Sequence, residues 1–275
     1  MSSTPAAGID YTESGHGPTV LFVPGSYSTP AAWKPIQRML PPQWRFVATS
    51  LCGYGQTAET RRAGDADMSH ELRVLEAVAR RVPGPVHLVG HSFGGTVALA
   101  GALSGRIEVA SLALFEANPL ALLHHHGHAD LHAATRRMSD AFEQAVAHAE
   151  HDAPGRIIDF WGGTSSFAAM PPAVQDYCRQ SAPANVLDWH TDFGYDFSGA
   201  DLARLTMPVL LVRGEQANPA MVAMTQVLAA HLPQARAAVV AGASHFLIST
   251  HPQECAALLA AHLAPQAQGV GRSAP

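Results

Sequence analysis

The stretch Val86–Gly95, which reads VHLVGHSFGG, decides the fold of this chain. Apolar residues run directly into a Gly-x-Ser-x-Gly pattern centred on Ser92, and a run of small, helix-compatible residues follows from Thr96 to Leu103. A strand that enters a helix through so tight a turn forces the central residue into a strained backbone conformation. Glycines at positions 90 and 94 remove the side chains that would collide there. The pattern therefore predicts a serine hydroxyl that stands clear of a sheet.

This turn resembles the nucleophile elbow of the α/β-hydrolase family. In that family the serine is the nucleophile, and the N–H group of the next residue, here Phe93, faces the developing oxyanion. The resemblance implies an α/β fold with a mostly parallel, doubly wound sheet and a helical cap insertion. Gly-x-Ser-x-Gly alone is a modest signal in a chain with 23 glycines. Its position between a buried-type strand and a helix is what supports the interpretation.

Strand patterns alternate with helical patterns on both sides of this turn. The apolar run Thr19–Val23 is typical of a strand buried on both faces, and Ala110–Phe115 and Pro208–Arg213 are further strand candidates. Between strands, Ser69–Val82 places its apolar residues on one stripe of a helix. The alternation predicts a mostly parallel sheet with helices on both faces, and catalytic groups at the carboxyl ends of its strands.

The character of the chain changes between residues 120 and 203, where helical periodicity dominates and no strand-like pattern is obvious. In the α/β-hydrolase family a helical cap over the active site occupies this position. We therefore expect residues 1–119 and 204–265 to form the core, 120–203 the cap, and 266–275 a disordered tail. Cap side chains would select the substrate and exclude water. We expect the substrate-binding residues to include Tyr27, Trp161, Phe167 and Trp189.

Position singles out one general base among the 16 histidines. His245 follows the last predicted strand, Ala237–Val240, in the sequence GASHF, which is where the family carries its base. A neutral imidazole with a pKa of about 6.5 can accept the serine proton and return it to a leaving group. His91, inside the elbow, is interpreted as a packing residue.

The loop after Thr19–Val23 departs from the usual family sequence. The family usually carries His-Gly here and uses this loop for the second oxyanion donor, whereas Pro24 stands in place of the histidine in this chain. Gly25 lies where a close backbone approach is wanted. The resemblance assigns the donor to the backbone N–H of Ser26, with Tyr27 as the alternative.

The acidic member of the triad is the second departure. Most relatives place an aspartate three residues beyond a glycine after the penultimate strand, but an alanine stands three residues beyond Gly214. Glu116, at the end of the strand after the elbow helix, is favoured because this position supplies the acid in some branches of the family. Glu215, or a neutral orienting residue such as Asn118 or Asn218, remains an alternative.

A histidine-rich segment of the predicted cap is a possible metal site. Spacing of four would put His124, His128 and His132 on one face of a helix. Gly127 interrupts the segment, and no thiolate or ordered acidic partner is evident. We therefore expect no metal and interpret the segment as a solvated cap face.

Composition narrows the functional classes. The chain has 275 residues, of which 47% are hydrophobic and 14% charged, and 17 basic against 22 acidic residues give a net charge of −5. No basic cluster suggests a nucleic-acid surface, and no apolar run of about 18 residues could span a membrane. Three distant cysteines and an N-terminus unlike a secretory signal favour a cytoplasmic protein.

These features together favour a cofactor-free serine hydrolase. Its expected substrate is a small molecule with a small to medium, partly apolar acyl group, most simply a carboxylic ester. Lactone, thioester and carbon–carbon bond cleavage fit the same machinery of Ser92, His245 and Glu116. A lyase or cofactor-free oxygenase on the same fold, and a non-hydrolytic binding protein, are the alternatives.

Overall fold

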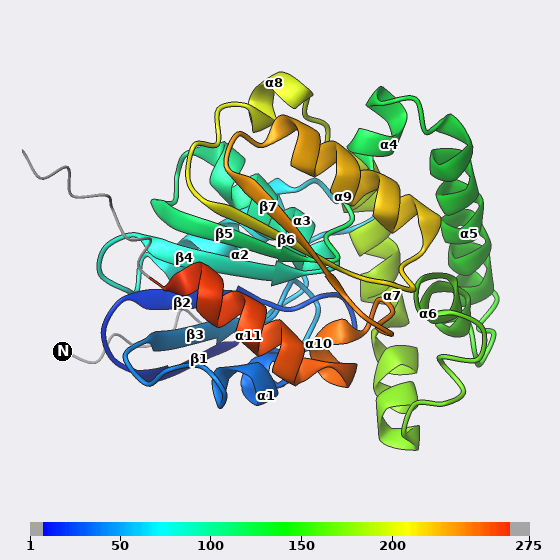
Figure 1. Ribbon diagram of the computed structural model, residues 1–275. Helices are drawn as coiled ribbons and strands as arrows, with labels where there is room; N and C mark the ends of the chain where they lie inside the picture. Colours follow the sequence, from blue (N-terminus) through cyan, green and yellow to red (C-terminus); the bar gives the residue numbers. More distant parts are fainter. Residues whose placement is uncertain (1–7, 265–275) are drawn as a thin grey trace, which may run out of the picture.

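A seven-stranded sheet forms the centre of the protein in the computed structural model, which describes residues 8–264. The strand order is β1-β3-β2-β4-β5-β6-β7 (Figure 1). β1 pairs antiparallel with β3, and every other neighbouring pair is parallel, as the sequence predicts. The strands are β1 (Tyr11–Gly15), β2 (Thr19–Val23), β3 (Arg45–Thr49), β4 (Val86–His91), β5 (Val109–Phe115), β6 (Val209–Gly214) and β7 (Ala235–Val240).

Helices cover both faces of the sheet because successive strand side chains point to opposite faces. On β2, Val20 and Phe22 belong to one apolar cluster, whereas Leu21 and Val23 belong to another. The first cluster is closed by η1 (Pro30–Trp33), α1 (Lys34–Gln37), α10 (Leu247–Thr250) and α11 (Pro252–Leu263). The second is closed by α2 (Ser69–Ala79), α3 (Phe93–Ser104) and α9 (Pro219–His231).

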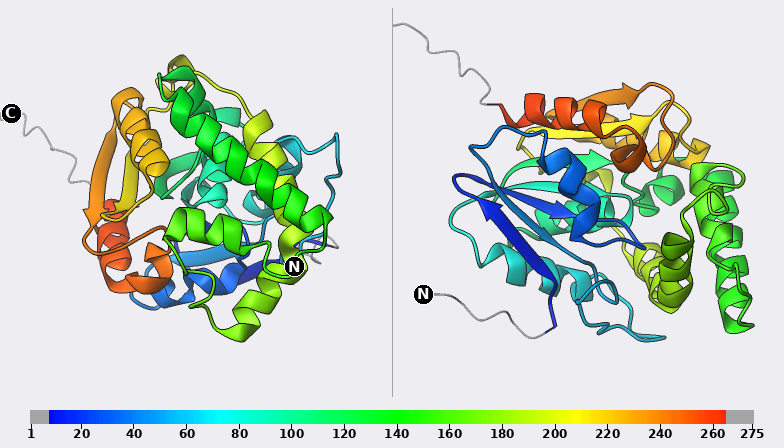
Figure 2. Two further views of the ribbon diagram at one scale, coloured as in Figure 1. Left: turned by 90° about the vertical axis from the view of Figure 1, so that its right-hand side faces the viewer. Right: turned by 90° about the horizontal axis from the view of Figure 1, so that it is seen from below.

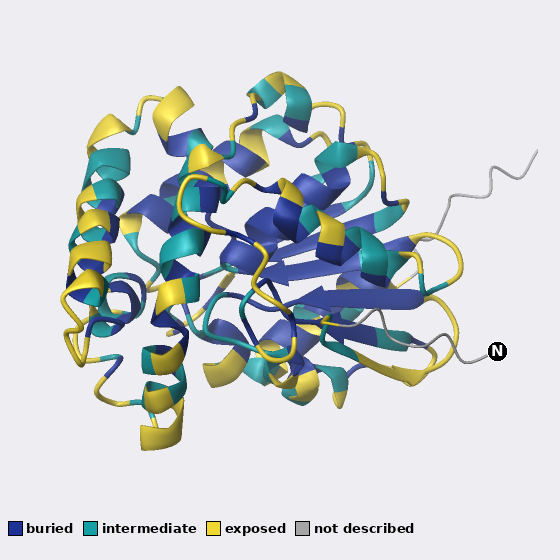
Figure 3. Cartoon of the chain, turned by 180° about the vertical axis from the view of Figure 1, so that it is seen from behind, coloured by how far each residue is buried: buried dark blue, intermediate teal, exposed yellow. Residues whose placement is uncertain are grey.

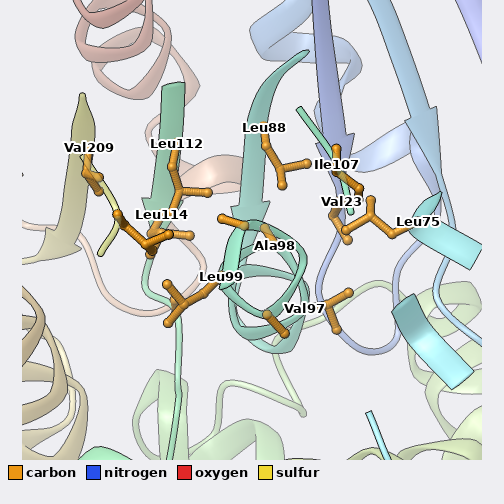
Figure 4. Packing of buried hydrophobic residues seen from close by; sticks show 14 of the residues in the cluster. Val23, Leu75, Leu88, Val97, Ala98, Leu99, Ile107, Leu112, Leu114 and Val209 are labelled. Atoms are coloured by element: carbon orange, nitrogen blue, oxygen red, sulfur yellow. The ribbon is translucent and has the colours of Figure 1, made fainter. Parts of the chain in front are cut away.

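Helix α3 lies in the middle of the second cluster. Figure 4 shows its Leu99 among strand side chains such as Leu88 and Leu112. The central strands are buried, while the outer faces of the surrounding helices are exposed (Figure 3). The small residues of α3 are therefore explained by close packing of this helix against the sheet.

Five helices lie between β5 and β6 in the chain. Four of them, α4 to α7, gather beyond the carboxyl ends of the strands (Figures 1 and 2). An apolar cluster joins their Phe142, Trp161 and Trp189 to Met221 and Met224 of α9, so this helical cap is packed against the core. The five are α4 (Ala121–His125), α5 (Ala129–Ala147), α6 (Gly155–Gly162), α7 (Pro172–Gly194) and α8 (Gly199–Leu202).

The last of these helices lies apart from the cap. α8 contacts α9, and its Leu202 is buried in the second sheet cluster. The helix thus packs with the core layer although it falls within the range 120–203. The tail expected from residue 266 and the N-terminal residues 1–7 lie outside the described residues.

Element ends differ from the sequence predictions by a few residues. The helix expected over Ser69–Val82 ends at Ala79, and its last turn tightens through a bond from the Val82 N–H to the Ala79 carbonyl. The proline that follows Val82 disfavours helical backbone at the residue before it. Within residues 8–264, no helix combines the length and the apolar character needed to cross a membrane.

Candidate active site

The turn between β4 and α3 holds Ser92 in a backbone conformation that L-residues rarely adopt, with φ 54° and ψ −131°. Such a conformation costs about 1–3 kcal/mol and persists only where its surroundings enforce it. A Cβ atom at Gly94 would lie 2.1 Å from the carbonyl oxygen of Pro24, and one at Gly90 would lie 2.4 Å from that of Gly94. The two glycines are thus required by close backbone approach at the predicted tight turn.

Three side chains from different loops meet beside this turn. Ser92 Oγ lies 3.0 Å from His245 Nε2, and His245 Nδ1 lies 3.0 Å from Glu116 Oε2. The other Glu116 oxygen accepts a 2.6 Å hydrogen bond from the N–H of Gly214. Ser92, Glu116 and His245 follow β4, β5 and β7, and Gly214 ends β6. Parallel strands bring these groups together because their carboxyl ends share one edge of the sheet.

The four candidates for the acid or orienting group are placed very differently. Glu116 is buried and contacts His245, whereas Glu215 is exposed and accepts from a backbone N–H just after β7. Asn218 caps the N-terminus of α9. Asn118 accepts a hydrogen bond from a threonine hydroxyl of α3. Of the four, Glu116 is the one within hydrogen-bonding distance of the imidazole.

The imidazole of His245 is packed between other rings. The ring centroids of Trp161 and His91 lie 5.6 Å and 5.0 Å from it. His91 Nε2 lies 2.9 Å from the carbonyl oxygen of His245 and donates to it. Burial, with a contribution from the nearby His245 ring, lowers the pKa of His91 to about 3. His91 therefore stays neutral at ordinary pH and supports the His245 loop through a hydrogen bond.

The two segments expected to supply oxyanion donors both adjoin Ser92. Phe93 is the first residue of α3, and the first N–H groups of a helix have no intrahelical acceptor. Ser26 and Tyr27 also line the cavity, and Tyr27 has a φ of 57°. A Cβ atom at Gly25 would lie 3.0 Å from the Cβ of Ser92, which places this loop directly against the elbow.

A buried polar network, which the sequence analysis missed, holds this loop in place. The hydroxyl of Ser26 donates to Asp188 of α7 at 2.5 Å, and the Tyr54 hydroxyl and the Arg61 guanidinium donate at 2.6 Å and 2.7 Å. Burial raises the pKa of the Asp188 carboxyl, whereas Arg61 and the two hydroxyls lower it. Since Asn185 donates as well, at 3.2 Å, Asp188 is surrounded by donors that favour a carboxylate.

One signal of this network was present in the sequence. Asn185, Asp188 and Asp192 recur at spacings of three and four, which places polar groups on one face of a helix that also carries Trp189. Arg61 gave no comparable signal, because a basic residue in a polar loop is normally exposed. Its partner lies 127 positions away in the sequence.

A cavity of about 220 Å³ adjoins Ser92 and His245 beneath the cap. Of the expected substrate-binding residues, Tyr27, Trp161 and Trp189 line it. The two indole rings are parallel, with centroids 6.2 Å apart. Phe167 is placed differently from the expectation: it packs with Ile158 and Cys178 in a small cluster and is not part of the cavity lining.

The histidine-rich segment does not converge as a set of metal ligands. The rings of His124 and His132 lie 5.4 Å apart, while His128 precedes α5 as its N-cap residue. Within residues 8–264, the group whose potential ligand atoms lie within 4.8 Å of one another is Asp65, Asp67 and His70.

Comparisons with known proteins agree with this architecture. Residues 20–258 match the model of the alpha/beta hydrolase family. A bromoperoxidase from Bacillus anthracis is 19% identical over 93% of this chain and 95% of its own, with a TM-score of 0.74. A thermophilic esterase from Thermogutta terrifontis is 21% identical over 91% of both chains, with a TM-score of 0.67. An alpha/beta hydrolase from Sphaerobacter thermophilus DSM 20745 is 22% identical over 92% and 95%, with a TM-score of 0.65. No curated protein matched the sequence.

Proposed function

The chain belongs to the alpha/beta hydrolase family, and from this premise we propose that it is a cofactor-free serine hydrolase of carboxylic esters. Its substrate carries a small to medium, partly apolar acyl group. The observation that carries the proposal is the chain of hydrogen bonds from Ser92 through His245 to Glu116, 3.0 Å at each step. Nucleophile, base and orienting acid within this reach are the arrangement that activates a serine hydroxyl.

The proposed reaction has two halves. Ser92 Oγ attacks the ester carbonyl carbon while its proton passes to His245 Nε2, and the tetrahedral intermediate collapses as Nε2 protonates the departing alcohol. A water molecule then attacks the acyl-enzyme, giving its proton to Nε2. Collapse of the second intermediate releases the carboxylic acid and returns the proton to Ser92. Glu116 holds the proton of the neutral imidazole on Nδ1 and stabilises the imidazolium.

The cavity supports the choice of substrate. The N–H groups of Phe93 and Ser26 would stabilise the oxyanion of each tetrahedral intermediate. Trp161 and Trp189 would bind the apolar part of the acyl group and exclude water from the imidazole. A cavity of about 220 Å³ favours a small-molecule substrate over a nucleic acid or a membrane surface.

A lyase or cofactor-free oxygenase on the same scaffold is the rival function. Such enzymes use the histidine as a base and need no nucleophilic triad, so they would not require an acid beside His245. The contact between Glu116 and His245 favours the hydrolase. One similar structure is named a bromoperoxidase, and a shared fold alone does not determine which reaction a protein catalyses.

Labelling with a fluorophosphonate separates these functions. We expect a stoichiometric adduct on Ser92, located by mass spectrometry, and none in Ser92→Ala or His245→Ala. Ser28→Ala, which alters another serine of the cavity lining, serves as the matched control and keeps the label. A folded wild-type protein that neither takes the label nor hydrolyses p-nitrophenyl acetate would refute the proposal.

A further inference from the structure

The cavity contains one buried polar group that the proposed reaction does not use. Asp192, on α7, lines the cavity and is only 2% exposed. Neither of its carboxyl oxygens makes a hydrogen bond of normal geometry with a described residue, although the Leu120 N–H lies near enough to lower its pKa. Most buried polar groups are paired, because an unpaired one loses its hydration without replacement. An unpaired carboxyl beside a candidate nucleophile therefore calls for a partner that arrives with the ligand.

Asp188, one helical turn away, provides an internal comparison. It lines the same cavity, but Ser26, Tyr54, Arg61 and Asn185 all donate hydrogen bonds to it. The same helix face thus carries one carboxyl satisfied by the protein and one that is not. The donors around Asp188 show that this fold can satisfy a buried carboxyl here.

No cation is among the described groups that shift the pKa of Asp192. Burial raises the pKa of Asp192 well above its ordinary value, the Leu120 N–H lowers it, and the negative charge of Asp188 raises it further. The indole rings of Trp161 and Trp189 line the same cavity. Asn118 lines the cavity as well, and its carbonyl oxygen is already occupied. Asp192 thus offers an acceptor for a ligand in a cavity that it shares with two indole rings.

We propose that Asp192 recognises a hydrogen-bond donor, a hydroxyl or an ammonium group, carried by the acyl part of the substrate. This inference rests on the proposed ester hydrolysis and specifies its substrate class. A donor would supply the partner that the carboxyl lacks, whereas a purely apolar acyl chain would leave it buried and unpaired. A hydrogen bond between the substrate donor and the Asp192 carboxyl corresponds to a preference of about 10- to 100-fold in kcat/KM over the matching apolar ester.

The test compares ethyl esters in a pH-stat. Ethyl butanoate and ethyl hexanoate are the apolar references. The 3-hydroxy and 3-amino derivatives of ethyl butanoate, and the 6-hydroxy and 6-amino derivatives of ethyl hexanoate, carry a donor at two distances from the carbonyl. We expect at least one donor ester to exceed its apolar reference about 10-fold or more. In Asp192→Leu this ratio should fall to about one or below. Asp140→Asn, which removes an exposed carboxylate from α5, is the control and should keep the wild-type ratio.

A second variant separates the two donors. Asp192→Asn keeps an acceptor oxygen but cannot carry a negative charge, so a hydroxyl preference should survive in part and an ammonium preference should be lost. The thermal midpoint distinguishes recognition from a structural role. Since the native carboxyl makes no hydrogen bond of normal geometry with the described residues, Asp192→Leu should melt no lower than wild type. A large drop in the midpoint would show that Asp192 supports the fold instead.

Two outcomes would overturn the inference. One is hydrolysis of the apolar esters with equal or lower kcat/KM for every donor ester, and the other is a donor preference that survives in Asp192→Leu. Absence of hydrolysis for all esters would count against the proposed function instead. In that case binding of ethyl 3-hydroxybutanoate and ethyl butanoate to Ser92→Ala, measured as shifts in thermal midpoint, still tests Asp192. Equal shifts of the thermal midpoint with the two esters would refute the role of Asp192 in recognising a donor.

Discussion

Replacing Glu116 by glutamine gives the sharpest test of the site, because both carboxyl oxygens are committed. One oxygen accepts from the Gly214 N–H at 2.6 Å and the other from His245 Nδ1 at 3.0 Å. A glutamine offers one acceptor oxygen and one NH₂ group. If its oxygen stays with Gly214, the NH₂ group faces Nδ1 and forces that atom to accept. The ring proton then moves to Nε2, where it prevents His245 from taking a proton from Ser92.

The opposite orientation of the amide is disfavoured. It would aim the NH₂ group at the Gly214 N–H and leave a buried donor unpaired, at a cost of about 1–3 kcal/mol. We therefore expect the wrong tautomer to dominate and kcat to fall by about 10⁴, the typical effect of this change in a triad. That loss corresponds to roughly 5 kcal/mol of activation free energy. KM should change little, because no substrate contact is removed.

Initial rates with p-nitrophenyl acetate measure this effect, and Glu215→Gln is the matched control. Glu215 is exposed and accepts from the Gly242 N–H, a bond that an amide oxygen can also accept. Its replacement should change kcat by less than about threefold. A collapse in Glu215→Gln, or a loss below tenfold in Glu116→Gln with the fold intact, would show that Glu116 does not orient His245.

Three further predictions concern stability, measured as the free energy of unfolding in urea. Gly94→Ala should lower the free energy of unfolding by about 3 kcal/mol or more, because the new Cβ meets the Pro24 carbonyl. Gly194→Ala is the control and should be nearly neutral, because its Cβ would meet nothing within 4 Å. Equal effects of the two substitutions would contradict the close approach at Gly94. Asp188→Asn breaks a buried ion pair with Arg61 and should lower the free energy of unfolding by about 3 kcal/mol. This is the lower end of the usual cost, because Glu59 and Glu71 still pair with Arg61. A loss under about 1 kcal/mol would mean that the network contributes little to stability. His91 has a pKa of about 3 when folded, below the ~6.5 of an exposed imidazole, so the unfolded state binds more protons and stability falls from about pH 6.5 towards pH 3. His91→Gln should remove about 2 kcal/mol of the loss between pH 7 and pH 5, and an unchanged pH dependence would rule out His91 as its source.

The elbow and the alternation of strands and helices were predictable because they are local. The geometry of a Gly-x-Ser-x-Gly turn depends on a few neighbouring residues, and a buried strand such as β2 is recognisable from its composition. The position of His245 after the last strand followed from the same order of elements. The family model matches residues 20–258, a range that includes all of these features.

The choice of acid needed tertiary structure. Glu116 and Glu215 both follow strands that end at the same edge of the sheet, and the sequence does not say which side chain turns inward. Glu116 has a φ of 46°, an uncommon backbone conformation that accompanies its contact with both the imidazole and Gly214. The position of Phe167 outside the cavity lining also needed tertiary structure, since an aromatic residue of the cap packs inside the cap as readily as against a ligand.

The sequence by itself predicted the fold, the elbow serine and the candidate base, because each depends on short-range pattern and on the order of elements. Only the tertiary structure revealed how α7 joins the candidate active site, through Asp188 to the Ser26 loop and through Asp192 to the cavity. Such contacts connect residues more than 100 positions apart. Their energy depends on burial and on which donors converge, and neither quantity is encoded in any one segment of the chain.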